Sequence, residues 1–347
     1  MRTILENLRI IAIVFLFVTL MVPVVKHIAI HINAVDIPNE RKVHKTIMPR
    51  IGGLAIFLGF LFGYVLFCEQ TIQMISILIG GFLIVTVGIF DDVKPLKPAI
   101  KFGGQILAVA VVVFYGNIVL QDISAYGIYI NFGMLAKPIT MFFMLAIINA
   151  VNLIDGLDGL ADGISAIFFI TIAFIGGIVG VSTGLDYSLT LIMIGATLGF
   201  LPFNFNPAKI FMGDTGSLFL GYMISVISLL GFKNVTLTSF VIPIVILAIP
   251  ILDTLFAIIR RLLKGQNIAH ADKEHFHHQM LRMMGSQKKT VLAIYMIQIL
   301  FSIASIIYVL KNPLWGQIIY IILLVLIIVF ILKTDIIFKR KRKDNVK

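Results

Sequence analysis

The sequence predicts an all-α integral membrane protein with about ten to eleven transmembrane helices. Of its 347 residues, 59% are hydrophobic and 13% are charged, whereas soluble domains average about 45–50% apolar and about 25% charged residues. Apolar runs of the roughly 17–25 residues that cross a bilayer recur along the whole chain. The single cysteine excludes a framework of intrachain disulfides.

The expected spans follow one another with short polar segments between them. The first apolar run precedes charged residues rather than a small-residue cleavage site, so we expect it to be retained as a span. In chain order the spans are expected at 8–25, 51–68, 73–90, 102–120, 138–154, 164–181, 188–203, 217–232, 240–259, 290–310 and 316–332.

Most of the 28 lysines and arginines lie on one side of the expected membrane. The positive-inside rule makes that side cytoplasmic and places the N-terminus outside. Topology therefore accounts for the net charge of +11, and we expect no nucleic-acid partner. We expect a single membrane-embedded domain over residues 1–347. Its functional cytoplasmic loops are expected at about 26–50, 91–101, 155–163, 204–216 and 260–289.

Two adjacent carboxylates, Asp91 and Asp92, end the third expected span. Adjacent carboxylates repel each other, so a divalent cation or cationic neighbours would relieve the pair. Mg²⁺ takes carboxylate oxygens and usually keeps waters and phosphate oxygens as further ligands. A polar stop at the membrane surface explains this pair equally well, and the motif by itself leaves both interpretations open.

The stretch NLIDGLDGLADG, residues 152–163, follows the fifth expected span. If that span continues as a helix past the membrane surface, Asp155, Asp158 and Asp162 share one helix face. Like charges at this spacing destabilise a helix, so an acidic stripe without lysine or arginine implies a bound partner. The glycines of this stretch leave room for a ligand or a neighbouring helix to approach.

Two further motifs carry polar chemistry on the same side. In FMGDTGS, residues 211–217, Asp214 lies between glycines, and Phe211 is either a stacking surface for a ligand or an interfacial anchor. An ordinary turn is the alternative for Asp214. HFHH, residues 275–278, follows several basic residues and suits phosphate oxygens. Zinc is the alternative for the histidines, although HExxH spacing and nearby cysteines are absent from the sequence.

Together these segments place carboxylates for a metal and basic side chains for phosphates on one side of the membrane. Catalysis of phosphoryl transfer depends mainly on positioning and on electrostatic stabilisation of the transferring oxygens. The combination therefore indicates an enzyme of phosphoryl transfer at the cytoplasmic surface. A transporter is the main alternative from another class, but Asp253 is the only acidic residue inside an expected span.

In their order along the chain, the motifs resemble those of the polyprenyl-phosphate N-acetylhexosamine-1-phosphate transferases, membrane enzymes of the glycosyltransferase 4 type. The likeness covers about residues 36–280 through PRIGG, FDD, NLIDGLDGLADG, FNFNPAKIFMGDTGS and HADKEHFHH. It implies transfer of N-acetylglucosamine 1-phosphate from UDP-GlcNAc to undecaprenyl phosphate in the bacterial plasma membrane, with UMP released. Such a step initiates teichoic acid or surface polysaccharide synthesis.

The resemblance also implies roles for individual residues. Asp91 and Asp92 would be catalytic, and Asp214 would bind Mg²⁺, with Mn²⁺ as an alternative. The residues expected to bind substrate are Asn152, Asp155, Asp158, Asn204, Phe211, Gly213, His275, His277, His278, Lys45, Arg50 and Lys101. Asp162 is the least assigned of the three aspartates, and we expect it either to lie at a helix end or to support the residues that contact the substrate.

Several alternatives remain within and beside this family. The sister enzyme that transfers phospho-N-acetylmuramoyl-pentapeptide shares the aspartate motifs but has three consecutive histidines in place of HFHH. A CDP-alcohol phosphotransferase shares the beginning of its signature with Asp155 and Asp158, but Asp162-Gly163 stands where Ala-Arg is required. Direct attack and a covalent phospho-enzyme both remain open as mechanisms, and a homodimer remains open as the assembly in the lipid bilayer.

Overall fold

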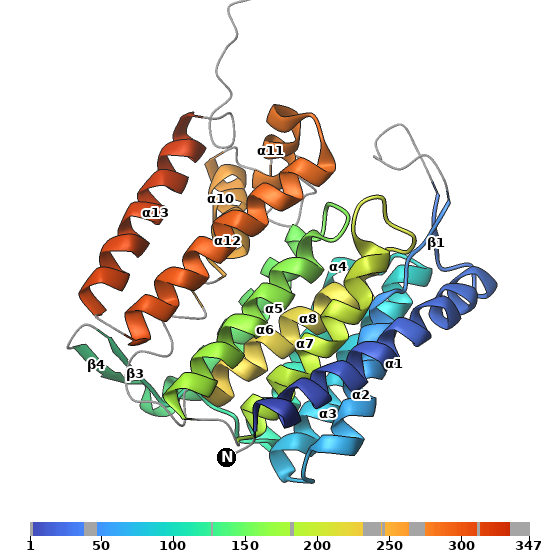
Figure 1. Ribbon diagram of the computed structural model, residues 1–347, viewed down its shortest axis with the longest axis horizontal. Helices are drawn as coiled ribbons and strands as arrows, with labels where there is room; N and C mark the ends of the chain where they lie inside the picture. The colour runs from blue at the N-terminus through green and yellow to red at the C-terminus, as the bar shows by residue number, and fades with distance from the viewer. Residues whose placement is uncertain are drawn as a thin grey trace, which may run out of the picture.

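The protein is a bundle of helices, seen here in a computed structural model (Figure 1). The structure describes residues 3–37, 47–125, 128–180, 184–231, 244, 247–263, 275–310 and 313–333. In chain order the helices are α1 (Ile4–His31), α2 (Gly53–Phe67), α3 (Ile72–Val93), α4 (Pro98–Ala110) with a π-helical turn at Val111–Tyr115, a 3-10 turn at Gly133–Leu135, α5 (Ala136–Ile154), α6 (Leu160–Val179), α7 (Leu185–Asn204), α8 (Gly213–Gly231), α10 (Ala248–Leu263), α11 (Phe276–Met284), α12 (Gln287–Leu310) and α13 (Pro313–Lys333).

The predicted fold class is confirmed, because the described residues contain eight helices that are long and apolar enough to cross a membrane. Two shorter apolar helices, Gly53–Phe67 and Leu314–Val329, add to these. The predicted count of about eleven spans stays a prediction. Lys45, the tail after 333 and parts of the expected loops 26–50 and 260–289 lie outside the described residues.

Helix α8 forms the centre of the bundle. It packs against α5 on one side and α3 on another, and most of its side chains are buried. Tyr222 of α8 donates a hydrogen bond from its hydroxyl to the Ile77 carbonyl of α3 at 2.8 Å. Gly221 lies so close to the α5 backbone at Ile148 that a side chain there would collide with it. The position of α8 is therefore fixed by two neighbours.

Strands are confined to two short antiparallel pairs among the described residues. β1 (Val35–Asp36) pairs with β2 (Met48–Pro49), and β3 (Asp122–Ala125) pairs with β4 (Ile128–Asn131). The β3–β4 hairpin lies at the same end of the bundle as the N-terminus, whereas β1 and α11 lie at the opposite end (Figure 1). The polar motifs described next belong to that opposite end.

The acidic stretch 155–163 does not continue the fifth helix, which corrects the expectation of one acidic helix face. α5 ends at Ile154, a short loop follows, and α6 begins at Leu160. Gly159 adopts φ +77° at the start of α6, a left-handed conformation that glycine adopts readily. Asp155 and Asp158 therefore lie in the loop, and Asp162 lies in the first turn of the next helix.

Candidate active site

The carboxylate of Asp92, in the last turn of α3, caps the first turn of α8. It accepts hydrogen bonds from the backbone N–H groups of Asp214 and Thr215 at 2.9 Å each, and from the Thr215 hydroxyl at 2.7 Å. Arg50 Nε lies 3.0 Å from Asp92 Oδ1. The first N–H groups of a helix lack partners inside the helix, so a carboxylate is favourable there. The contacts of Asp92, predicted to be catalytic, thus set the position of Asp214.

Two glycines allow α3 and α8 to approach each other this closely. Gly213 begins α8 at φ +70°, and a side chain there would collide with the Arg50 carbonyl and the Asp92 carboxylate. On α3, a side chain at Gly88 would collide with the backbone of Thr215. Gly213 was predicted to contact substrate. The close packing of α3 and α8 is a further reason for glycine at this position.

Asp214, the predicted metal ligand, is the centre of a polar cluster drawn from five parts of the chain. Its carboxylate is paired with Lys101 Nζ of α4 and lies 3.6 Å from Arg50 Nη2. The Asn152 amide of α5 donates to Asp214 Oδ1 at 3.3 Å. Lys101 Nζ is also 3.6 Å from Asp91 Oδ2. The structure therefore brings together five residues that the sequence had predicted for one site.

The cluster suits a metal ion that takes only one or two ligands from the protein. Asp91 and Asp214 each expose 13% of their side chains, so both carboxylates are accessible at the end of the bundle. Mg²⁺ is commonly held by one or two carboxylates together with phosphate oxygens and waters. The described residues contain no group of three or more His, Cys, Asp or Glu side chains arranged to hold a metal.

Asn204 and Asp158, both predicted to bind substrate, connect the α5–α6 loop with the α7–α8 loop. The buried Asn204 side chain accepts from the Gly159 N–H at 3.1 Å and donates to the Ile210 carbonyl at 3.1 Å. Asp158 Oδ2 accepts from the Asn206 amide at 2.9 Å and from the Ala208 backbone N–H at 3.2 Å. These bonds fix the two loops to each other beside the polar cluster.

Asp155 lies at the end of α5 on the same surface. Burial of the carboxyl raises the pKa of Asp155 to about 7, and the negative charges of Asp92 and Asp158 act in the same direction. The positive charge of Arg50 opposes this shift. A carboxyl with a pKa near neutrality can hold or release a proton at the pH of the cytoplasm.

The three histidines of HFHH lie at the start of α11. The Nδ1 atoms of His275 and His277 are each 3.2 Å from a carboxylate oxygen of Asp253 in α10. Burial, together with the neighbouring imidazoles of His277 and His275, lowers the pKa of His278 to about 4. His278 is consequently neutral at physiological pH, and its environment differs from that of the other two.

Phe211, predicted to stack on a ligand, is held by its backbone beside β2. Its N–H donates to the Pro49 carbonyl at 2.8 Å, and its own carbonyl accepts from the Gly52 N–H at 2.9 Å. These two bonds attach the α7–α8 loop to the PRIGG segment, which carries Arg50. Stacking by the Phe211 ring stays a prediction.

Sequence reasoning did not assign three residues that the structure places next to the predicted ones. The Asn149 amide of α5 donates to Gln105 Oε1 of α4 at 2.7 Å, one helical turn from Asn152 and Lys101. This pair fixes the spacing of the two helices below the polar cluster. Asp253 is the third, and its position inside an apolar run was a usable signal, because ionisable residues in such runs usually have a function.

The chain is similar in sequence to several known proteins. Residues 74–232 match the family model for glycosyl transferase family 4. The chain is 46% identical over 341 residues to the probable undecaprenyl-phosphate N-acetylglucosaminyl 1-phosphate transferase of Bacillus subtilis, with 96% of this chain and 93% of that protein covered. It is 35% identical to the decaprenyl-phosphate N-acetylglucosaminephosphotransferase of Mycobacterium tuberculosis, with 78% and 75% covered. It is 31% identical to the undecaprenyl-phosphate alpha-N-acetylglucosaminyl 1-phosphate transferase of Escherichia coli O157:H7, again with 78% and 75% covered.

Proposed function

Because this chain belongs to glycosyl transferase family 4, we propose that it transfers N-acetylglucosamine 1-phosphate to undecaprenyl phosphate in a bacterial membrane. The observation that carries the proposal is the cluster of Asp91, Asp214, Lys101 and Arg50 at one end of the bundle. Carboxylates and cations alternate there, as a site for phosphate groups and their counter-ions requires.

We take the donor to be UDP-GlcNAc. An oxygen of the lipid phosphate attacks the phosphorus that carries the sugar, a new P–O bond forms, and the P–O bond to UMP breaks. The products are undecaprenyl diphosphate-GlcNAc and UMP. Lys101 and Arg50 are placed to stabilise the negative charge on the transferring oxygens. Asp155, whose pKa burial raises to about 7, lies in the α5–α6 loop and would contact the nucleotide sugar.

Asp214, with Asp91 beside it, would hold Mg²⁺ in this site. When bound, the ion would neutralise charge on the diphosphate and orient its oxygens. Lys101 lies between these two carboxylates and already supplies one positive charge there. The amide of Asn152 keeps Asp214 in its orientation through a hydrogen bond. Asp91 and Asp214 would thus hold the metal ion beside the positive charge of Lys101.

A direct test uses the purified protein in lipid nanodiscs with undecaprenyl phosphate, labelled UDP-GlcNAc and Mg²⁺. We expect UMP and a labelled lipid diphosphate in equal amounts, and at least a 100-fold lower rate for Asp214→Asn, in the range that loss of one transition-state contact produces. Asp122→Asn on the β3–β4 hairpin, at the other end of the bundle, is the matched control and should keep the wild-type rate. Transfer by Asp214→Asn at the wild-type rate would exclude the metal assignment.

The same assay separates the alternative functions. UDP-N-acetylmuramoyl-pentapeptide in place of UDP-GlcNAc tests the sister activity, and release of CMP from a CDP-alcohol tests the other phosphotransferase family. Uptake of UDP-GlcNAc into vesicles without a lipid product would indicate a transporter. We expect activity with UDP-GlcNAc alone among these, and activity without Mg²⁺ or Mn²⁺ would remove the cation from the proposal.

We further place the active site on the cytoplasmic face and the N-terminus outside. The excess of lysine and arginine in the loops at the active-site end supports this orientation, and nucleotide sugars are cytoplasmic substrates. The lipid product would begin a teichoic acid or a surface polysaccharide. A homodimer is compatible with this proposal, and the size of the protein in nanodiscs is its measurement.

A further inference from the structure

Asp253 is a buried carboxylate that holds the start of α11 through three hydrogen bonds. Its side chain accepts from the Phe276 N–H at 2.8 Å and lies 3.2 Å from the Nδ1 atoms of both His275 and His277. Only 4% of Asp253 is exposed. One carboxylate of α10 therefore orders three consecutive residues of the HFHH motif.

These contacts determine which ring nitrogen carries the proton. An ionised carboxylate is only an acceptor, so an imidazole that bonds to it through Nδ1 must carry a proton on Nδ1. The Phe276 N–H, which can only donate, supports the acceptor role of the same carboxylate. His275 and His277 consequently share one orientation, in which Nε2 points away from Asp253 and is left for another partner.

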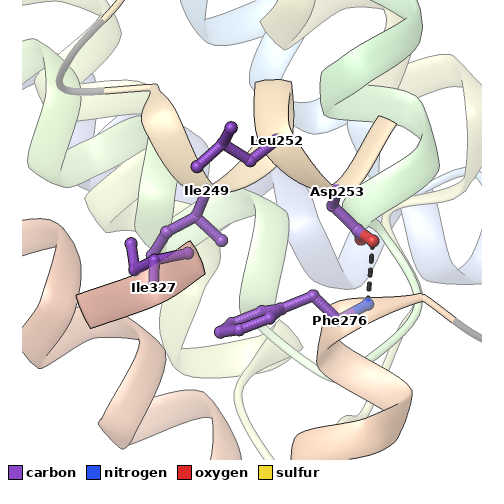
Figure 2. A pocket seen from close by; sticks show the side chains of 5 residues that line it. All are labelled: Ile249, Leu252, Asp253, Phe276 and Ile327. Atoms are coloured by element: carbon purple, nitrogen blue, oxygen red, sulfur yellow. Dashed lines mark hydrogen bonds between the residues drawn. The ribbon is translucent and has the colours of Figure 1, made fainter. Parts of the chain in front are cut away.

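Asp253 also lines an apolar pocket between α10, α11 and α13. Figure 2 shows Ile249, Leu252 and Ile327 around it, with the Phe276 ring turned toward Ile327 and the Phe276 N–H turned toward the carboxylate. Alternate side chains of HFHH thus point in opposite directions, the rings of His275 and His277 toward the acid and Phe276 toward the pocket. The low local polarity strengthens the hydrogen bonds that hold the imidazoles.

The Nε2 atom of His277 is buried and has no hydrogen-bond partner among the described residues. It lies directly over Gly156, where a Cβ would collide with it. Gly156 itself is exposed and belongs to the same short loop as Asp155. A buried nitrogen without a partner is unfavourable, so a ligand hydroxyl that reaches this loop from solvent and donates to Nε2 would satisfy it.

We propose that Asp253 is a positioning residue that fixes the Nδ1–H form of His275 and His277 and so leaves His277 Nε2 as an acceptor for a hydroxyl group of the nucleotide sugar beside Gly156. This inference rests on the transferase function proposed above. It assigns different tasks to the histidines: His277 contacts the substrate, and His275 completes the arrangement around the acid.

The first test replaces Asp253 by Asn. The amide nitrogen cannot accept a hydrogen bond, so one imidazole loses its partner and can transfer its proton to Nε2. We expect kcat to fall about 10–100-fold, as for the loss of a residue that orients a ligand-binding histidine, while KM for UDP-GlcNAc changes by less than about threefold. ¹⁵N NMR of histidine-labelled protein should show one Nδ1–H signal replaced by an Nε2–H signal. Asp186→Asn in α7 is the matched control.

Gly156→Ala provides a second test if Asp253→Asn does not fold. It leaves Asp253 unchanged but displaces the His277 ring, so kcat should fall by a similar factor. Gly177→Ala in α6, where a Cβ meets only the Tyr187 hydroxyl at 3.5 Å, is its control. Because both changes act through His277, the double variant should be about as active as the less active of the two single variants.

Two results would overturn the inference. One is a kcat within about twofold of wild type for Asp253→Asn or Gly156→Ala, well below the loss expected for a positioning residue. The other is retention of both Nδ1–H signals in Asp253→Asn. Failure of the wild-type protein to form the lipid product would instead refute the proposed function, and the NMR result would still decide the role of Asp253.

Discussion

Asp155 and Asp92 lie close together, but their environments lead to different behaviour. Asp92 has donors on both carboxylate oxygens and caps α8, whereas Asp155 lies in the α5–α6 loop, where burial raises its pKa to about 7. Sequence alone could identify both as carboxylates of one site. It could not separate their tasks, because the donors that surround Asp92 come from another helix. Sequence alone also could not show the hydrogen bonds of Asp158 and Asn204, because these bonds join two loops that meet only in the folded protein.

Removal of Asp92 should destabilise the protein more than it alters substrate binding. Asp92→Ala removes the acceptor of Arg50 Nε and of the first N–H groups of α8, at a cost of about 3 kcal/mol. We expect the Tm of the detergent-solubilised protein to fall by several degrees, with Asp122→Ala as an exposed control. Equal Tm values for the two variants would contradict the capping role.

Asp155 should give the protein a pH-dependent stability. Its pKa is raised to about 7 in the fold, against about 3.9 in an unfolded chain. Between these values the folded state binds more protons than the unfolded state, so the contribution of Asp155 to stability falls as pH rises from about 4 to about 7. The Tm of the wild type should therefore drop more between about pH 5 and about pH 8 than that of Asp155→Asn. Parallel Tm profiles would argue against the raised pKa.

At the scale of elements, composition predicted the helices well but not their ends. Apolar runs mark the residues that can lie in a membrane, and the expected spans 73–90 and 138–154 correspond to α3 and α5. The break after Ile154 was missed because spacing by itself does not distinguish a charged helix from a loop. Gly159 was the available signal, since a left-handed residue often begins or ends a helix.

Gly159 offers a prediction about this break. Gly159→Ala places a side chain at φ +77° and 3.1 Å from Phe205, whereas Gly180→Ala at φ +83° meets nothing within 4 Å. The backbone penalty is about 1–2 kcal/mol at either position. We expect both variants to lose stability, but only Gly159→Ala should also lose transferase activity, because its loop carries Asp155 and Asp158. Equal activity of the two variants would show that the loop is not part of the site.

At the scale of the whole molecule, the arrangement of the helices predicts which end can be reached from outside the cell. α2 begins at Gly53, beside the polar cluster, and runs away from it to Phe67. Cys68, the single cysteine of the chain, therefore lies at the end opposite the active site. A membrane-impermeant maleimide should label it in intact cells. A cysteine introduced at Ala208 should react only after the membrane is opened, and the reverse pattern would invert the proposed orientation.

The central position of α8 also has a consequence for biosynthesis. α8 presents Ser225, Ser228 and Tyr222 within a bundle that covers it almost completely, so lipid is a poor substitute for its neighbours. Its partners α3 and α5 are both made earlier on the ribosome. A nascent chain that has inserted only α1 to α7 lacks the helix against which α3 and α5 pack, so we expect the contacts that position Asp214 to form only after α8 has been inserted.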